Sequence, residues 1–79
     1  MAKIKIVKTN KLFLDYLDKD YSNINIIKTN NSLILKNSEI EIFINENHKL
    51  NLSEQGLLIE GYCLINENLG SLTILFTEI

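Results

Sequence analysis

The chain has 79 residues, of which 46% are hydrophobic, and a net charge of −2 at pH 7. A chain of this length makes one domain, residues 1–79, and its apolar fraction is too high for a disordered protein. Its single cysteine excludes an internal disulfide. No apolar run approaches the roughly 20 residues of a membrane-spanning helix, and the Lys-Ile alternation at the N-terminus differs from a signal peptide. We therefore expect a cytoplasmic protein that does not bind membranes.

Charge is distributed very unevenly along the chain. Residues 1–36 hold seven Lys and three Asp, a net charge of +4, whereas residues 37–79 hold one Lys and seven Glu, a net charge of −6. We call these the basic half and the acidic half. Such an asymmetry is informative about partners and association rather than about the fold.

Alternation of apolar and polar residues predicts β-strands along most of the chain. Asn-rich stretches at Thr29–Asn31 and Asn66–Gly70 predict turns between strands, because Asn tolerates left-handed backbone conformations. Without long crossover segments the strands must be mostly antiparallel. The predicted strands lie around Lys3–Ile6, Asn23–Ile26, Ser32–Lys36, Glu39–Ile44, Leu57–Ile65 and Leu72–Phe76.

The segment 10–21 has a different pattern. Leu14, Leu17 and Tyr21 are spaced three and four residues apart, as on one face of a helix. A strand is the competing interpretation, because Leu12–Leu17 also half-alternates. The sequence therefore predicts an α+β fold, in which one short N-terminal helix packs on an antiparallel sheet of five or six strands. An all-β barrel or sandwich is the alternative.

The residues that could carry chemistry are few and scattered. His48 stands alone in a polar stretch typical of an exposed turn, and Cys63 lies in an apolar strand within the acidic half, where a core position is expected. The series Asp18, Asp20, Ser22 begins like a calcium loop, but that loop requires a Glu where Thr29 stands. We expect no enzyme, no cofactor and no metal site.

Direct binding of nucleic acid is also not expected. Lys3, Lys5 and Lys8 could contact phosphates, but the chain has no Arg, the residue that grips phosphate and guanine in two places. Tyr16 and Tyr21 could stack on bases, yet they lie among three Asp that would repel the nucleic-acid backbone. The Lys residues fit the solvated face of an edge strand better.

The acidic half suggests a protein-binding surface instead. Glu39, Glu41 and Phe43 alternate with three Ile, so a strand with its Ile face inward exposes an aromatic ring beside two carboxylates. An apolar anchor with a charged rim is typical of protein interfaces. The competing interpretation is that the helix covers Phe43 and that the Glu residues only solvate the surface. The predicted partner-binding residues are Glu39, Glu41, Phe43, Glu46, Glu60 and Glu67.

In size and charge alone, the chain resembles phage-encoded inhibitors of bacterial defence systems, anti-CRISPR proteins among them. The resemblance implies a stoichiometric, non-enzymatic inhibitor whose carboxylates occupy a basic, nucleic-acid-binding surface of another protein. The alternative is a structural protein that self-associates, as a homodimer or larger assembly, with the basic half of one copy against the acidic half of the next.

Overall fold

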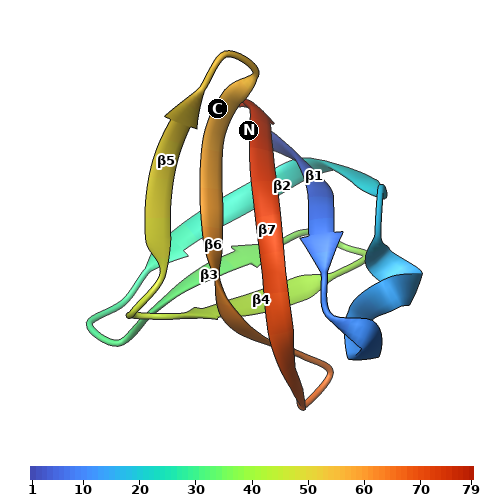
Figure 1. The fold of residues 1–79 in the computed structure, drawn as a ribbon. Helices are drawn as coiled ribbons and strands as arrows, with labels where there is room; N and C mark the ends of the chain where they lie inside the picture. Colours follow the sequence, from blue (N-terminus) through green and yellow to red (C-terminus); the bar gives the residue numbers. More distant parts are fainter.

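The computed structural model describes residues 1–79 as an all-β fold with one short 3-10 helix (Figure 1). No helix is long and apolar enough to cross a membrane. The elements, in chain order, are β1 (Ala2–Thr9), the 3-10 helix (Lys11–Tyr16), β2 (Asp20–Lys28), β3 (Ser32–Lys36), β4 (Glu41–Asn45), β5 (Lys49–Ser53), β6 (Gly56–Ile65) and β7 (Asn68–Glu78).

Six of the seven strands form a closed antiparallel barrel. The sheet runs in the order β4-β3-β2-β1-β7-β6-β5, and an additional pairing between β4 and β6 closes it. That closing pairing is short, with Phe43 opposite Leu64 and Ile44 opposite Cys63. Strand β5 pairs only with β6 and therefore lies outside the closed barrel.

Strand β6 pairs with two different strands along one of its edges. Its first half pairs with β5 and its second half with β4. Gly61 lies between these two halves, where the chain that leads from β4 to β5 passes close by. A Cβ atom at Gly61 would lie 3.0 Å from the Cβ of His48, so the absence of a side chain lets the β4–β5 turn cross against β6.

The barrel interior is entirely apolar. The inward positions of the strands, together with Phe13 of the 3-10 helix and Ile40 before β4, form one cluster of seventeen buried residues, and no polar or charged residue is classed as buried. Because β-branched side chains pack well on a pleated surface, the Ile-rich composition suits this core. The cluster contains Ala2, Ile4, Ile6, Phe13, Tyr21, Ile24, Leu33, Leu35, Ile40, Ile42, Ile44, Ile59, Cys63, Ile65, Leu72, Ile74 and Phe76.

Strand β2 contains a bulge, and the side chain of Asn37 forms hydrogen bonds that join the β3–β4 turn to this strand. Between the pairs Ala2–Ile24 and Ile4–Tyr21 the strand β2 holds an extra residue, and Asn23 has a φ of 57° there. Such bulges bend and twist a strand. The Asn37 side chain donates to the Ser22 carbonyl at 2.8 Å and accepts from the backbone N–H groups of Glu39 and Ile40. It thereby holds the β3–β4 turn against β2.

The predicted α-helix over residues 10–21 is wrong, and with it the α+β class; the alternative of an all-β barrel describes the fold. Both ends of this segment are tied to the sheet. Asn10 donates to the Ser71 carbonyl at 3.2 Å, and Asp18 donates to the Ile6 carbonyl at 2.7 Å. A 12-residue α-helix would carry the chain about 18 Å away from its start, whereas this chain must return at once to β1.

Instead of a helical face, the segment buries one ring. The 3-10 helix is kinked at Phe13, which is only 2% exposed, while Leu14 is 57% exposed. The Phe13 ring lies over Gly70, where a Cβ atom would come within 2.5 Å of it. It also contacts the ring of Tyr16 edge-on, with 5.8 Å between the ring centres.

The strand predictions are largely confirmed, but the number of strands is seven instead of five or six. The hairpin at Thr29–Asn31 joins β2 to β3, and the Ile face of β4 is buried as expected. The missed strand is β5. Its five residues alternate polar and apolar side chains as the other strands do, so the strand pattern was present in the sequence and was overlooked, although all five residues are exposed in the fold.

We expect the Phe13→Ala variant to lose about 3 kcal/mol of unfolding free energy, because it leaves a cavity that Gly70 cannot fill. Urea denaturation followed by circular dichroism measures this loss. The matched control is Leu14→Ala, which should change stability by less than about 0.5 kcal/mol. Equal effects of the two variants would contradict the packing of Phe13 against Gly70.

Candidate functional site

The most distinctive surface feature is a row of apolar residues that crosses the outside of the barrel. Its members lie directly opposite one another on five neighbouring strands, β2, β3, β4, β6 and β7. We call it the outer apolar row; it consists of Ile27, Ile34, Phe43, Leu64 and Leu69.

Four of the five members are substantially exposed to solvent. Phe43 is 38% exposed, Leu64 42% and Leu69 63%. Tyr62, two residues before Leu64 on the same face of β6, is 67% exposed. These side chains line a shallow hollow of about 310 Å³. Single exposed apolar residues are common on proteins, whereas apolar residues that adjoin one another over several strands are a feature of interaction surfaces.

Polar residues flank the outer apolar row on both sides. Toward the β3–β4 turn, Lys36 lies opposite Glu41, and their charged groups form an ion pair at 3.8 Å. Toward the β2–β3 turn, Ser32 lies opposite Asn45, and beyond them Tyr62 lies opposite Ser71. An apolar centre with a polar rim is the arrangement found in protein–protein interfaces.

The barrel turns the charge asymmetry of the sequence into two sides of the molecule. The basic half forms β1, β2 and β3, which are neighbours, and the acidic half forms β4, β6 and β7, which are also neighbours. The two sides meet at the seams β3–β4 and β1–β7. The chain has two ion pairs, and each of them crosses one seam.

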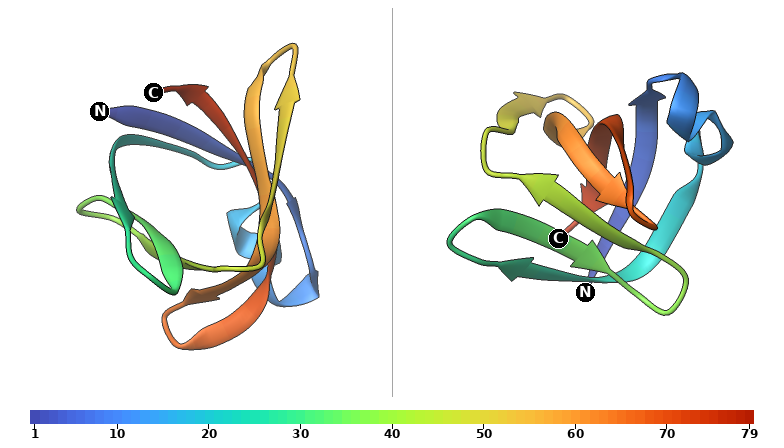
Figure 2. Two further views of the ribbon diagram at one scale, coloured as in Figure 1. Left: turned by 90° about the vertical axis from the view of Figure 1, so that its left-hand side faces the viewer. Right: turned by 90° about the horizontal axis from the view of Figure 1, so that it is seen from below.

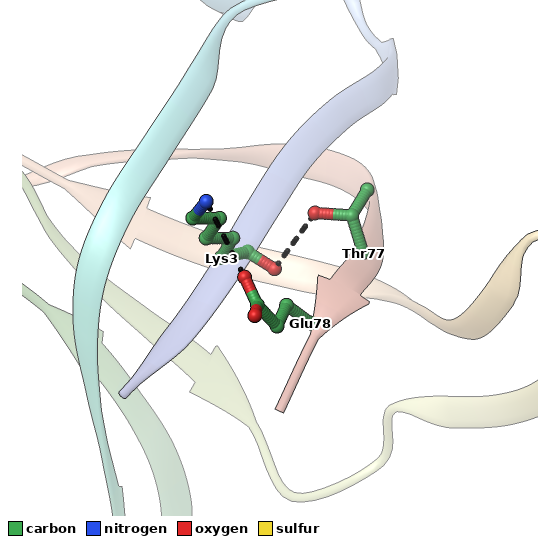
Figure 3. A network of polar contacts seen from close by, with 3 residues as sticks. All are labelled: Lys3, Thr77 and Glu78. Atoms are coloured by element: carbon green, nitrogen blue, oxygen red, sulfur yellow. Dashed lines mark hydrogen bonds and ion pairs between the residues drawn. The ribbon is translucent and has the colours of Figure 1, made fainter.

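Figure 3 shows the seam at β1–β7. The Lys3 ammonium lies 3.3 Å from the Glu78 carboxylate, and the Thr77 hydroxyl donates to the Lys3 carbonyl at 3.3 Å. Both charged side chains are more than half exposed, so the pair adds no more than about 1 kcal/mol to stability. Away from the seams the carboxylates make no ion pair.

The structure brings some of the predicted partner-binding residues together and separates others. Glu41 and Phe43 share the outer face of β4, as predicted, and Glu67 lies in the turn that leads to Leu69. Glu46 lies in the turn that leads away from β4 to β5, and Glu60 faces a separate groove.

Glu39 is the sixth of these residues, and it lies in the turn before β4. Its carboxylate is close enough to Tyr21 to affect that phenol. The pKa of Tyr21 is raised above 10.0, first by burial and then by Tyr16 and Glu39. Glu39 itself is exposed and precedes β4, so it is not a member of the outer apolar row.

Sequence reasoning missed four members of the outer apolar row and Tyr62. Ile27 and Ile34 could have been matched from the hairpin that joins β2 and β3. Leu64 and Leu69 also face each other in one hairpin. However, Phe43 meets Leu64 only through the closing pair of the barrel, and nothing in the local pattern indicates that contact.

A second depression, of about 480 Å³, is polar and lies between β1, β7, β6 and the β4–β5 turn. Lys8, Thr73, Glu60 and Lys49 follow one another across the strands along it. The hydroxyl of Thr9 in its wall is buried without a hydrogen-bond partner. The central carboxylate of Glu60 would repel an anion held between the two Lys residues.

The two other residues singled out in the sequence have structural roles. Cys63 is 2% exposed, which confirms the predicted core position, and burial raises the pKa of its thiol to about 12. The His48 Nδ1 donates to the Asn45 carbonyl at 2.7 Å within the β4–β5 turn, because a carbonyl oxygen can only accept. No group of three or more His, Cys, Asp and Glu side chains lies close enough to hold a metal ion.

No protein family, curated protein or solved structure matches this chain.

We expect Cys63 to resist thiol reagents at pH 8 in the folded protein, because burial blocks access and the raised pKa keeps the thiol protonated. Labelling by iodoacetamide, followed by mass spectrometry, should require urea. The matched control is Tyr62→Cys, which places a thiol at the exposed neighbouring position and should be labelled at once. Rapid labelling of Cys63 in the native wild type would contradict its place in the core.

Proposed function

We propose that the chain is a non-enzymatic protein-binding module of the cytoplasm, and that the outer apolar row is its docking surface. The observation that carries this proposal is the continuity of the row. Five apolar residues lie in register across five strands, and four of them are well exposed in the isolated protein. A partner that docks on the row would remove their apolar surface from water.

The dimensions of the row suit a protein better than a small molecule. Neighbouring strands lie about 4.8 Å apart, so the row follows the curved wall of the barrel for about 19 Å, and Phe43, Leu64 and Leu69 form the stretch of it that lines one hollow with Tyr62. A partner that covers this curved stretch and its polar rim can bury the roughly 800 Å² of a standard interface. The hollow at Phe43 is shallow and open, whereas sites for small molecules are usually concave enough to enclose most of the ligand.

Charge favours a basic partner. Phe43, Leu64 and Leu69 lie on strands of the acidic half, whose net charge is −6. Five of its carboxylates, those of Glu39, Glu46, Glu54, Glu60 and Glu67, form no ion pair within the chain. Complementary charge speeds the encounter of two proteins and selects among partners.

The class of partner that we propose is a basic, nucleic-acid-handling protein of a bacterial defence system. Such a protein binds phosphates with Lys and Arg, and carboxylates can occupy the same groups. The size and charge of the chain, which resemble those of phage-encoded inhibitors, support this proposal. The chain would act stoichiometrically, with Phe43 as the apolar anchor and Glu41 and Glu67 at the rim.

The proposal is tested by affinity capture from a bacterial lysate, with the chain as bait and proteins identified by mass spectrometry. We expect retention of a basic nucleic-acid-binding protein that added DNA displaces. With that protein purified, Phe43→Ser should weaken binding at least tenfold, as for the central anchor of an interface. The double variant Glu41→Lys, Glu67→Lys should weaken binding and reduce its dependence on salt.

Two matched controls distinguish the outer apolar row from general surface effects. Leu14→Ser changes an apolar residue that is more exposed than Phe43 but lies on the 3-10 helix. Glu54→Lys reverses a charge in the β5–β6 turn. Both should bind like the wild type. If Phe43→Ser also binds like the wild type, the outer apolar row is not the docking surface.

A further inference from the structure

Strand β5 carries two leucines that point toward the core side of the sheet but have no core to pack on. Leu50 lies opposite Ile59, and Leu52 lies opposite Leu57. Ile59 is buried and Leu57 is packed against the core. Residues directly opposite each other in antiparallel strands share a face, yet Leu50 is 58% exposed and Leu52 is 88% exposed.

The closure of the barrel explains this exposure. Since β4 pairs with the second half of β6, the barrel closes without β5, which stays at the free edge of the sheet. In Figure 1, β5 lies beside β6 on one side and has no strand on the other, and Figure 2 shows the β5–β6 hairpin standing away from the β2–β3 hairpin. A free edge presents unpaired backbone N–H and C=O groups, which can pair with another strand.

The sequence of β5 is symmetric in chemical type about its centre. Asn51 is flanked by Leu50 and Leu52, and these in turn by the polar residues Lys49 and Ser53. An isologous interface, in which the same surface of two copies meets about a two-fold axis, requires such self-complementarity. We propose that β5 pairs antiparallel with β5 of a second copy of this chain, with Asn51 at the two-fold axis.

In this register every residue of β5 meets a compatible neighbour. Leu50 of one copy lies opposite Leu52 of the other, so four leucines form one apolar patch that covers the exposed core-side face. Lys49 lies opposite Ser53 of the second copy and next to Glu54 of that copy, and no two like charges are opposed. The pairing joins the two sheets through their free edges and removes the edge from solvent.

This dimer is independent of the proposed docking surface. Leu50 and Leu52 lie on the core-side face of the sheet, whereas Phe43 and Leu64 lie on its outer face. The dimer would therefore present two outer apolar rows. A failure of the dimer leaves the proposed function in place, and a failure of Phe43-dependent capture leaves the dimer in place.

Sedimentation equilibrium of the full chain between about 5 and 500 µM tests the proposal. We expect a monomer–dimer equilibrium in this range, and Leu52→Glu should raise the dissociation constant at least tenfold. Because Leu52 is 88% exposed, this substitution leaves the barrel intact, which circular dichroism verifies. The matched control is Leu14→Glu on the 3-10 helix, which should dimerise like the wild type. A wild type that is monomeric at 500 µM, or a Leu52→Glu variant that dimerises like it, overturns the proposal.

Disulfide crosslinking tests the register. Two Asn51 Cα atoms at the axis would be about 4.5–5.5 Å apart, within reach of a disulfide. The two Lys49 Cα atoms would be separated by about four residues along the strand, or roughly 13 Å. Under mild oxidation, Asn51→Cys should form a covalent dimer and Lys49→Cys should not. If the edge of β5 instead pairs with an extended segment of a different protein, Asn51→Cys should crosslink no better than Lys49→Cys. Equal crosslinking of the two variants would overturn the pairing of two copies.

Discussion

The short pairing between β4 and β6 is the contact on which the remainder of the structure depends. Without it the seven strands would form an open sheet whose inner face could not enclose a core. With it, Ile44 and Cys63 face a sealed apolar interior while Phe43 and Leu64 face outward as neighbours. The same pairing uses one edge of β6 and leaves β5 outside the barrel. Core, outer apolar row and free edge strand thus follow from one closure.

Topology also decides where charge lies. Strands that follow each other in the chain are mostly neighbours in the barrel, so the basic and acidic halves of the sequence become two sides of the molecule. Each ion pair lies at a seam between these sides, which leaves the acidic side without internal neutralisation. The proposed docking surface rests on this arrangement, because an apolar row that extends onto the acidic side could supply both an anchor and electrostatic steering.

Local patterns predicted most of the strands and placed Phe43 on the face of its strand opposite the Ile residues, because alternation and turn chemistry act over a few residues. The predicted fold class was wrong because contacts between residues far apart in the sequence decide the structure of residues 10–21. Leu14 and Leu17 have helical spacing, but backbone hydrogen bonds from Asn10 to β7 and from Asp18 to β1 hold the segment to a short, kinked 3-10 helix. For the same reason, Phe43 was the only member of the outer apolar row that the sequence predicted. The barrel closure places Leu64 beside Phe43, but neither the sequence of β4 nor that of β6 indicates this contact.

The closing pair is tested most directly by nuclear Overhauser effects between β4 and β6 in the labelled protein in solution. The account predicts cross-strand contacts from the backbone protons of Phe43 to those of Leu64 and from Ile44 to Cys63, with amides at this seam among the slowly exchanging ones. The absence of these contacts, together with fast amide exchange along β4, would contradict it, because the strands would then form an open sheet.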